Sequence, residues 1–262
     1  MNAEPMIQAA LPRASRYDRA WAEANSLGEN VLYFAESLCN VLPLSPGMRV
    51  IDLGCGHAIS SIFLAREFGV TVWAVDRAID PTANLARIEA MGCADSVFPL
   101  RADVRALPLP HGYFDAAVSL DSFLYFGTDE RFLPFFARHL KPGGYIGVVD
   151  ACLSREIESA AELPVEARAV WEQDWWGVHT IDWWRRLWQR TGLVNVLCAE
   201  VLPESDLIKQ SYDDQYREDP AEAGFIALME AEKGQLVSSY RLVGQRTDRP
   251  IFLEDADTDY AY

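Results

Sequence analysis

A turn with two glycines between an apolar run and a helix constrains the fold of this chain more than any other feature. The turn closes the stretch Val50-Ile51-Asp52-Leu53-Gly54-Cys55-Gly56, and a second apolar run, Val72-Trp73-Ala74-Val75-Asp76, ends in an acid. The residues between the two runs have the periodicity of an amphipathic helix. A strand-turn-helix-strand unit of this kind brings the backbone close to a nucleoside and places a carboxylate on its ribose hydroxyls. The sequence therefore predicts an α/β fold with a nucleoside site.

The glycine pattern also limits the ligand. A dinucleotide fingerprint has a third glycine three residues after the second, and that position here is Ile59. The turn therefore lacks the full pyrophosphate signature and suits a nucleoside that carries an amino acid. A nicotinamide-dependent oxidoreductase becomes the weaker alternative.

Three further motifs follow in a fixed order. Asp103 follows a short apolar strand, Asp115 follows a Leu- and Pro-rich segment, and Leu140-Lys141-Pro142-Gly143-Gly144 precedes another strand. With this order and spacing, residues 45–152 resemble the class I S-adenosylmethionine (SAM) methyltransferases, especially those that act on small molecules. Residues 121–129 and 179–194 are similar to a subgroup of bacterial methyltransferases.

Near-continuous apolar strands alternate with helices, which predicts a parallel sheet covered on both faces. The resemblance implies a doubly wound, Rossmann-like sheet of about seven strands in the order 3-2-1-4-5-7-6, with the last strand antiparallel. We expect strands at residues 49–53, 70–75, 96–102, 114–120, 145–151, 193–201 and 235–246. We expect helices at residues 15–42 with a break near Gly28, at 58–68, from Asp80-Pro81 onwards, at 128–140 and at 220–232.

The domain organisation follows from these elements. We expect one domain over residues 1–262, since a chain of this length can form one large α/β domain with an elaboration, although length alone would also allow two domains. Its expected parts are an N-terminal helical cap (15–42), the cofactor-binding core (45–152), a substrate-covering insertion between strands five and six (153–192), closing strands (193–246) and an acidic tail (247–262).

The resemblance assigns five residues to the methionine end of SAM. Gly54, Cys55 and Gly56 would let the backbone approach the methionine part, since a Cβ at either glycine would crowd it. Asp52 would order this loop and reach the ammonium directly or through water. Asp121 would supply a carbonyl or carboxylate to the same ammonium.

Five more residues are assigned to the nucleoside and the cofactor carboxylate. Asp76 would accept both ribose hydroxyls, and Arg77 would lie along the adenine face. Asp103 would accept the adenine amino proton, and the Val104 amide would meet a ring nitrogen. Tyr17, in the helical cap, would cover the carboxylate, with core packing as its alternative role.

Six of the eight tryptophans fall in one segment, at positions 171, 175, 176, 183, 184 and 188. Large rigid rings can wall an apolar pocket, and a cation can rest on their π faces. The alternative is core packing, since Trp184 and Trp188 are spaced to share one helix face.

Methyl transfer from a sulfonium is an in-line displacement that depends on positioning, and only a hydroxyl acceptor requires a general base. The candidates for a catalytic role are His179 in the insertion and Tyr125 after the fourth strand. For His179 a hydrogen-bonded structural role is the alternative. His57, in the glycine loop, fits cofactor binding better.

Charge and composition exclude several partners. Asp and Glu number 39 against 23 Lys and Arg, a net charge of −16, and no run of basic residues occurs. Nucleic acid and anionic membrane surfaces are therefore disfavoured. The segment after the fourth strand begins Asp121-Ser122-Phe123, which differs from the Asn/Asp-Pro-Pro-aromatic signature of enzymes that methylate bases or glutamine amides.

Two further features indicate the compartment. No apolar run approaches the length of a membrane span. The five cysteines form no CxxC pair, which argues against a disulfide framework and a zinc site and favours a reducing cytoplasm.

The resulting prediction is a metal-free, SAM-dependent transfer of a methyl group to N, O or C of a small molecule. A non-catalytic SAM-fold binding protein is the alternative. The protein would be a monomer or a homodimer.

Overall fold

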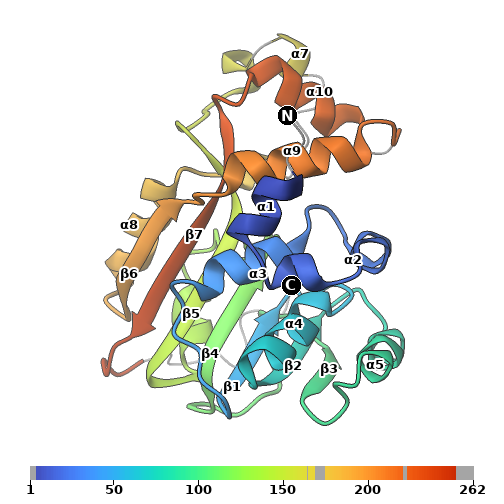
Figure 1. The fold of residues 1–262 in the computed structure, drawn as a ribbon. Helices are drawn as coiled ribbons and strands as arrows, with labels where there is room; N and C mark the ends of the chain where they lie inside the picture. The colour runs from blue at the N-terminus through green and yellow to red at the C-terminus, as the bar shows by residue number, and fades with distance from the viewer. Residues whose placement is uncertain (1–3, 164, 169–174, 221–222, 252–262) are drawn as a thin grey trace.

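The computed structural model describes residues 4–163, 165–168, 175–220 and 223–251. Within these residues a seven-stranded sheet crosses the molecule in the order β3-β2-β1-β4-β5-β7-β6 (Figure 1). The strands are β1 (Arg49–Leu53), β2 (Thr71–Asp76), β3 (Val97–Arg101), β4 (Phe114–Leu120), β5 (Leu140–Leu153), β6 (Val194–Val201) and β7 (Val237–Arg246). The predicted order is confirmed.

Strand direction places the functional loops at one edge. The strands β1 to β5 are mutually parallel, whereas β7 is antiparallel to both β5 and β6. The carboxyl ends of the first five strands therefore meet at one edge of the sheet. The order reverses between β1 and β4, and ligands of open α/β sheets bind at this switch point.

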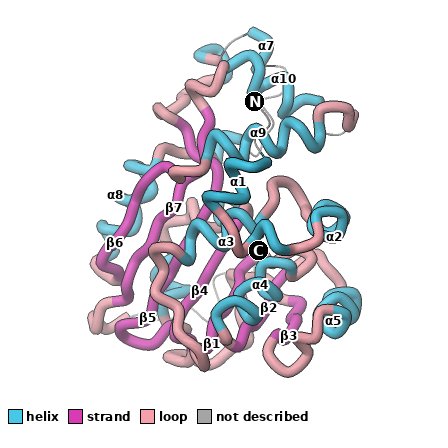
Figure 2. Tube along the Cα trace, viewed as in Figure 1, coloured by secondary structure: helices cyan, strands magenta, loops and turns pink. Residues whose placement is uncertain are grey.

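The helices partly differ from those predicted. They are α1 (Glu4–Ala10), α2 (Arg19–Asn25), α3 (Val31–Cys39), α4 (Ile59–Phe68), α5 (Pro81–Ala90), α6 (Phe132–Ala137), α7 (Val165–Arg168), α8 (Ile181–Thr191), α9 (Ser205–Tyr216) and α10 (Ala223–Glu232). Figure 2 shows how they surround the sheet. The expected helix start at Asp80 is confirmed, because its carboxylate accepts the Thr82 amide at 2.9 Å. The helices α1, α7 and α9 have no predicted counterpart.

The helix expected at residues 128–140 is shorter than predicted. The Asp129 carboxylate accepts the Arg131 amide at 2.8 Å and forms a turn, so the helix starts only at Phe132. At the other end, the His139 carbonyl accepts the amides of Tyr113 and Phe114. The chain has joined the sheet by this point, and β5 accordingly begins at Leu140, before the predicted residue 145.

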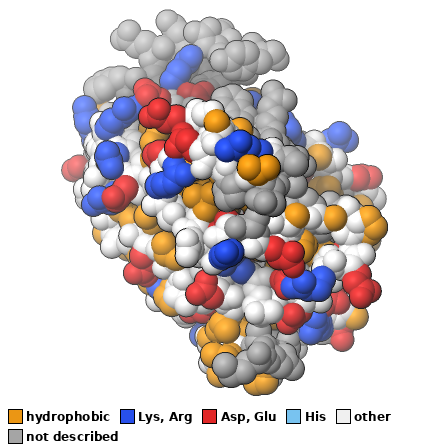
Figure 3. Space-filling model, turned by 90° about the horizontal axis from the view of Figure 1, so that it is seen from above, with side chains coloured by type: hydrophobic (Ala, Val, Ile, Leu, Met, Phe, Trp, Pro, Cys, Tyr) orange, Lys and Arg blue, Asp and Glu red, His pale blue; other side chains and the backbone are white. Residues whose placement is uncertain are grey.

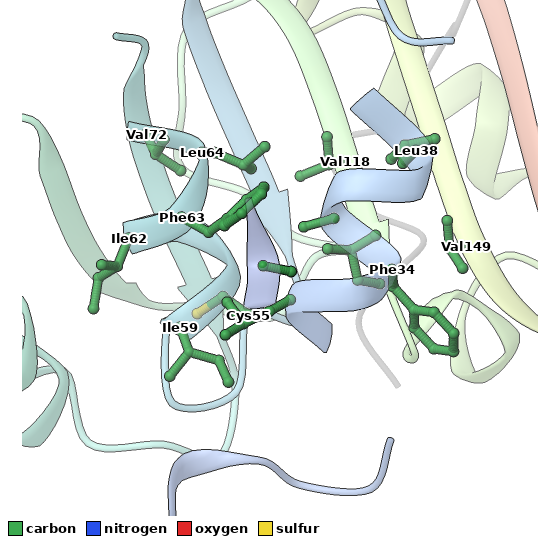
Figure 4. Packing of buried hydrophobic residues seen from close by; sticks show 14 of the residues in the cluster. Phe34, Leu38, Cys55, Ile59, Ile62, Phe63, Leu64, Val72, Val118 and Val149 are labelled. Carbon is green, nitrogen blue, oxygen red and sulfur yellow. The ribbon is translucent and has the colours of Figure 1, made fainter. Parts of the chain in front are cut away.

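One face of the sheet is covered by α3 and α4, which lie side by side on it (Figure 4). Phe34 and Leu38 of α3 and Phe63 of α4 are buried against strand residues such as Val118 and Val149. A Cβ on Gly147 would come within 3.0 Å of a Leu38 methyl group, so the glycine lets α3 lie close to β5. This packing fixes both helices relative to the strand ends.

The opposite face is covered by α6 and α8, where two of the clustered tryptophans lie. Trp184 and Trp188 of α8 are fully buried and contact the ring of Phe123 at centroid distances of 5.4 and 5.9 Å. The Thr180 hydroxyl caps the helix start, and Gly192 ends the helix in the left-handed conformation. Core packing of these two tryptophans is thereby confirmed. Trp171 lies outside the described residues.

A smaller apolar cluster stands beyond the ends of β5 and β7, where α7, α9 and α10 gather (Figures 1 and 2). Its buried members include Leu153, Leu163, Val178 and Leu228. The described residues between Leu153 and Val178 therefore lie beyond the ends of these strands, whereas α8 lies on a face of the sheet. The acidic tail beyond residue 251 lies outside the described residues.

We predict that Trp188→Ala lowers the free energy of unfolding by about 3–5 kcal/mol, because it empties a fully buried site. Trp183→Ala is the matched control, since the Trp183 ring is only partly buried and stacks on His179. Urea unfolding followed by circular dichroism measures both. Equal losses in the two variants would contradict the assignment of Trp188 to the core.

Candidate functional site

A cavity of about 450 Å³ opens at the carboxyl ends of the parallel strands. The predicted positions that line it are Gly54, Cys55, Gly56, Asp76, Arg77, Asp103, Val104, Asp121 and Tyr125. The predicted positions that do not line it are Tyr17, Asp52 and His179. The cavity thus unites residues from four loops that are far apart in the sequence.

The glycine loop forms the floor of this cavity. Gly54 and Gly56 adopt left-handed conformations with φ of 73° and 52°. A Cβ on Gly54 would lie 2.5 Å from the Ser122 hydroxyl oxygen. The loop therefore requires glycine for its conformation and for the close approach of the β4 loop.

Asp76 ties the glycine loop to the end of β2. One carboxylate oxygen accepts the Gly56 amide at 3.0 Å, and the other accepts the amides of Ala78 and Ile79 at 2.7 and 3.1 Å. A carboxylate has about four acceptor positions, so capacity for a ligand hydroxyl remains. The backbone thus fixes this carboxylate in the cavity wall.

Asp103 is held by a residue that the sequence did not single out. The Arg105 guanidinium donates to both Asp103 carboxylate oxygens, at 2.9 and 2.6 Å. These hydrogen bonds hold the pKa of Asp103 below its usual value, so the carboxylate stays ionised. Val104 lies beside it in the cavity wall, and Arg105 adds a cation there.

Asp52 lies beneath the loop. It is almost fully buried, and one carboxylate oxygen accepts the hydroxyls of Ser60 and Ser61 at 2.7 and 2.6 Å. Burial raises the pKa of Asp52 to about 6, although these two hydrogen bonds oppose the shift. Its position links the end of β1 to the first turn of α4, and it does not reach the cavity wall.

Tyr17 and His179 also lie away from the cavity. The Tyr17 hydroxyl donates to Glu67 at 3.2 Å, and its ring packs on Phe63 of α4. The His179 ring stacks on Trp183 with centroids 3.8 Å apart, and its Nδ1 lies 2.9 Å from a carboxylate oxygen of Glu156. Both side chains are thus engaged in contacts within the protein.

The loop between α2 and α3 covers the glycine loop, a contact that the sequence did not predict. Asn25, Leu27 and Gly28 line the cavity, and the Leu27 side chain reaches over Gly56. The His57 Nδ1 lies 3.0 Å from the Asn25 carbonyl oxygen, which links the two loops. The break expected near Gly28 was the available signal for this loop.

Asp121 ends β4 in a strained backbone conformation. Its φ is 55°, a value that non-glycine residues seldom adopt, and its amide donates to the Val149 carbonyl at 2.9 Å. The backbone turns so that Asp121 lines the cavity beside Gly28. Such strain is concentrated at functional sites.

The described residues contain neither a metal-binding cluster nor a membrane-spanning helix. In this part of the chain no group of three His, Cys, Asp or Glu side chains is arranged to hold a metal ion. Among the helices described, none has the length and apolarity to cross a bilayer. On the face drawn in Figure 3, basic and acidic side chains are interspersed.

Comparison with known proteins connects this geometry to a family. Residues 50–144 match the family model described as a methyltransferase domain. Phosphoethanolamine N-methyltransferase 3 of Arabidopsis thaliana is 29% identical over 144 residues, which are 55% of this chain and 29% of that protein. The chain thus spans about a third of the length of the plant relatives that it matches.

Solved structures share the fold. Phosphoethanolamine N-methyltransferase 2 of Haemonchus contortus, solved with phosphomonomethylethanolamine and S-adenosylhomocysteine, matches with a TM-score of 0.69 at 15% identity, over 95% of this chain and 61% of that one. The cyclase SpnF matches with a TM-score of 0.61 at 18% identity, over 85% and 84%.

The sequence match covers the glycine loop, Asp76, Asp103 and Asp121, which are the residues that the fold assembles around the cavity. The strand order, with its antiparallel β7, agrees with the same family. Residues 50–144 of this chain thus resemble a methyltransferase domain in sequence, and the chain shares its fold with solved methyltransferases.

Proposed function

We propose that this protein transfers the methyl group of SAM to a nitrogen, oxygen or carbon of a small-molecule acceptor. The observation that carries the proposal is the Asp76 carboxylate, fixed by three backbone amides beside the glycine loop at the switch point of the sheet. This arrangement presents a ribose-binding carboxylate and an unobstructed backbone to the same cavity.

The residues present fit the cofactor. Gly54 and Gly56 leave room where a Cβ would collide with Ser122 or crowd Leu27, and the cavity is within the range of about 300–1,000 Å³ typical of small-molecule sites. In the proposed arrangement Asp76 and Arg77 hold the ribose and adenine. Asp103 and Val104 recognise the adenine edge, as the sequence suggested.

The methionine end would extend from Gly54, Cys55 and Gly56 towards Asp121. In this proposal Asp52 holds the glycine loop in place, because its carboxylate accepts hydrogen bonds from Ser60 and Ser61 beneath that loop. The bound SAM supplies a methyl group on a sulfonium, and the protein's contribution is to orient the acceptor in line with it and exclude water.

Of the two proposed catalytic residues, Tyr125 lines this cavity and His179 does not. Tyr125 is 61% exposed, so its hydroxyl can meet an acceptor that enters from solvent. We therefore place Tyr125 at the acceptor end. For His179 we propose a supporting role, in which the Glu156 and Trp183 contacts hold the segment before α8.

A second function requires a test because the cyclase SpnF shares the fold. The fold alone therefore does not determine the reaction. A protein that binds the cofactor for another purpose would show cofactor affinity without consuming SAM in the presence of any acceptor.

We predict that S-adenosylhomocysteine binds to the purified protein and that Asp76→Ala weakens this binding by about two orders of magnitude. The substitution removes a ligand hydrogen bond to a charged group, worth about 1.5–3 kcal/mol, and also the contact of Asp76 with the Gly56 amide of the glycine loop. Titration calorimetry measures the affinity, and Asp95→Asn, which removes one exposed carboxylate, is the control. Absence of binding by the folded wild-type protein would overturn the proposed function.

We also predict that Gly28→Ala impairs cofactor binding more than its strain alone explains. Gly28 has φ of +97°, and an added Cβ would lie 2.7 Å from an Asp121 carboxylate oxygen. Gly47→Ala is the control, because its φ is +83° and nothing lies within 4 Å of the position that an added Cβ would take.

Both substitutions should cost about 1–2 kcal/mol of stability from left-handed strain. Only Gly28→Ala displaces a cavity-lining carboxylate, so only this variant should lose S-adenosylhomocysteine affinity in calorimetry. If both variants bind the ligand as the wild type does, Asp121 has no part in the cofactor site.

A further inference from the structure

Three carboxyl groups from separate parts of the chain interact electrostatically, and one of them, Asp121, lines the cavity. Glu29 lies in the loop before α3, Asp121 follows β4, and Asp150 lies in β5. The backbones of Asp121 and β5 are joined by the hydrogen bond from the Asp121 amide to Val149, and the Asp121 carboxylate lies over Gly28, next to Glu29. We refer to Glu29, Asp121 and Asp150 as the acid triad.

Nearby positive charge in the described residues is scarce. Lys209 of α9 is the cation whose charge bears on Glu29, but its ammonium donates to the Val237 carbonyl at 2.8 Å. Asp150 is fully buried, and its carboxylate accepts the amides of Leu124 and Ala151 at 3.0 and 2.8 Å. Amide dipoles therefore compensate the charge of Asp150 in part.

Two polar atoms in this region have no hydrogen-bond partner among the described residues. One is Oε2 of Glu29, which is shielded from solvent, and the other is the hydroxyl of Tyr240, a fully buried residue paired with Asp150 across β5 and β7. Buried polar groups are nearly always satisfied, so each such group calls for an explanation. A ligand that brings hydrogen-bond donors and a positive charge is a direct explanation for Glu29.

The pKa values of Glu29 and Asp150 are raised, as expected for carboxyl groups that lack a compensating positive charge. Burial, followed by the charges of Asp121 and Asp150, raises the pKa of Glu29 to about 8. Burial, followed by the charge of Asp121, raises the pKa of Asp150. A cation that reached the acid triad would favour the ionised forms of both residues.

The position of the triad separates it from the nucleoside side of the cavity. Asp76 and Asp103 belong to the β2 and β3 side, whereas Asp150 belongs to β5, on the far side of β1 and β4. Asp121 lines the cavity between these two sides. In the proposed function, Asp121 binds the one ammonium group of the cofactor. Glu29 and Asp150 are then available to a second cation.

We propose that the methyl acceptor is an amine, which enters as an ammonium ion and is held at the acid triad beyond Asp121. This inference rests on the proposed function and names its substrate class. Glu29 is the acid-triad member that we assign to the proton, because its Oε2 has no other partner in the described structure.

The chemistry of this assignment balances. The ammonium N–H bond breaks, and its proton passes to the Glu29 carboxylate, leaving a neutral amine with a lone pair. That lone pair forms the new N–C bond to the methyl group as the C–S bond breaks, and the C–S electron pair remains on sulfur. The product is a methylated ammonium ion, and Glu29 returns its proton to solvent.

The test uses two probes of the same shape that differ in charge. Choline and 3,3-dimethylbutan-1-ol differ by the replacement of a quaternary nitrogen with carbon. Each is titrated by calorimetry into the protein saturated with S-adenosylhomocysteine. We expect choline to bind at least about tenfold more tightly than the alcohol, since only choline carries a positive charge that the carboxylates attract.

Matched variants separate the acid triad from general surface charge. Glu29→Gln should reduce choline affinity by about tenfold, and Glu29→Asp should retain part of it. Glu23→Gln removes a carboxylate from α2, where Glu23 pairs with Arg19, and should change nothing. Affinity for S-adenosylhomocysteine should change far less than choline affinity in all three variants.

In the protein without S-adenosylhomocysteine, choline affinity should also rise between pH 7 and pH 9. Glu29 ionises over this range and is faced by Asp121, Asp150 and Lys209, while choline keeps its charge at every pH. The alcohol should bind equally at both pH values, and Glu29→Gln should remove most of the rise in choline affinity.

The outcomes distinguish the two proposals. If S-adenosylhomocysteine binds but choline binds no better than the alcohol, the amine acceptor is overturned while the proposed function stands. If Glu29→Gln weakens S-adenosylhomocysteine as much as choline, the triad serves the cofactor ammonium and the inference is again overturned. Failure of S-adenosylhomocysteine to bind overturns the proposed function itself.

Discussion

The hydrogen bonds of the Asp76 carboxylate to three backbone amides are the interaction on which the site depends. They join the end of β2 to the glycine loop that follows β1, so two parallel strands present their carboxyl ends as one surface. A carboxylate already held by the backbone loses little further freedom when it accepts ligand hydroxyls. The same contact requires the Gly56 amide to lie close to the Asp76 carboxylate. Because Gly56 has no side chain, nothing stands between this loop and a ligand.

The sequence was informative where local pattern decides structure. The strand ends at Asp76 and Asp103 and the glycine loop followed from apolar runs and turn residues, and the cavity contains them. The α2–α3 loop and Arg105 depend on contacts between distant segments, which periodicity does not encode. Helix α9 is rich in polar residues, so its apolar stripe is too sparse to detect. The hydrogen bonds of Asp52 to Ser60 and Ser61 of α4 are likewise tertiary contacts, which the motif spacing did not indicate.

The acidic residues of this chain differ in their environment. The net charge of −16 costs little where the carboxylates are exposed to solvent. The acid triad differs, because Glu29 and Asp150 are withdrawn from solvent close to a third carboxylate. Such a group is destabilising unless a cation or a proton compensates it, and folded proteins retain such costs at functional sites. The strained φ of Asp121 lies in the same place, which strengthens this interpretation.

Asp121 connects the two halves of the proposed reaction. It lines the cofactor cavity, and its charge contributes to the raised pKa of Glu29. An ammonium group of the cofactor beside Asp121 would cancel part of that charge, so the pKa of Glu29 would fall and the carboxylate would ionise more readily. Cofactor binding would thus favour the ionised, basic form of Glu29 before the acceptor binds. Because binding couplings are reciprocal, an ammonium at the acid triad would in turn act on the affinity for the cofactor through the same carboxylate.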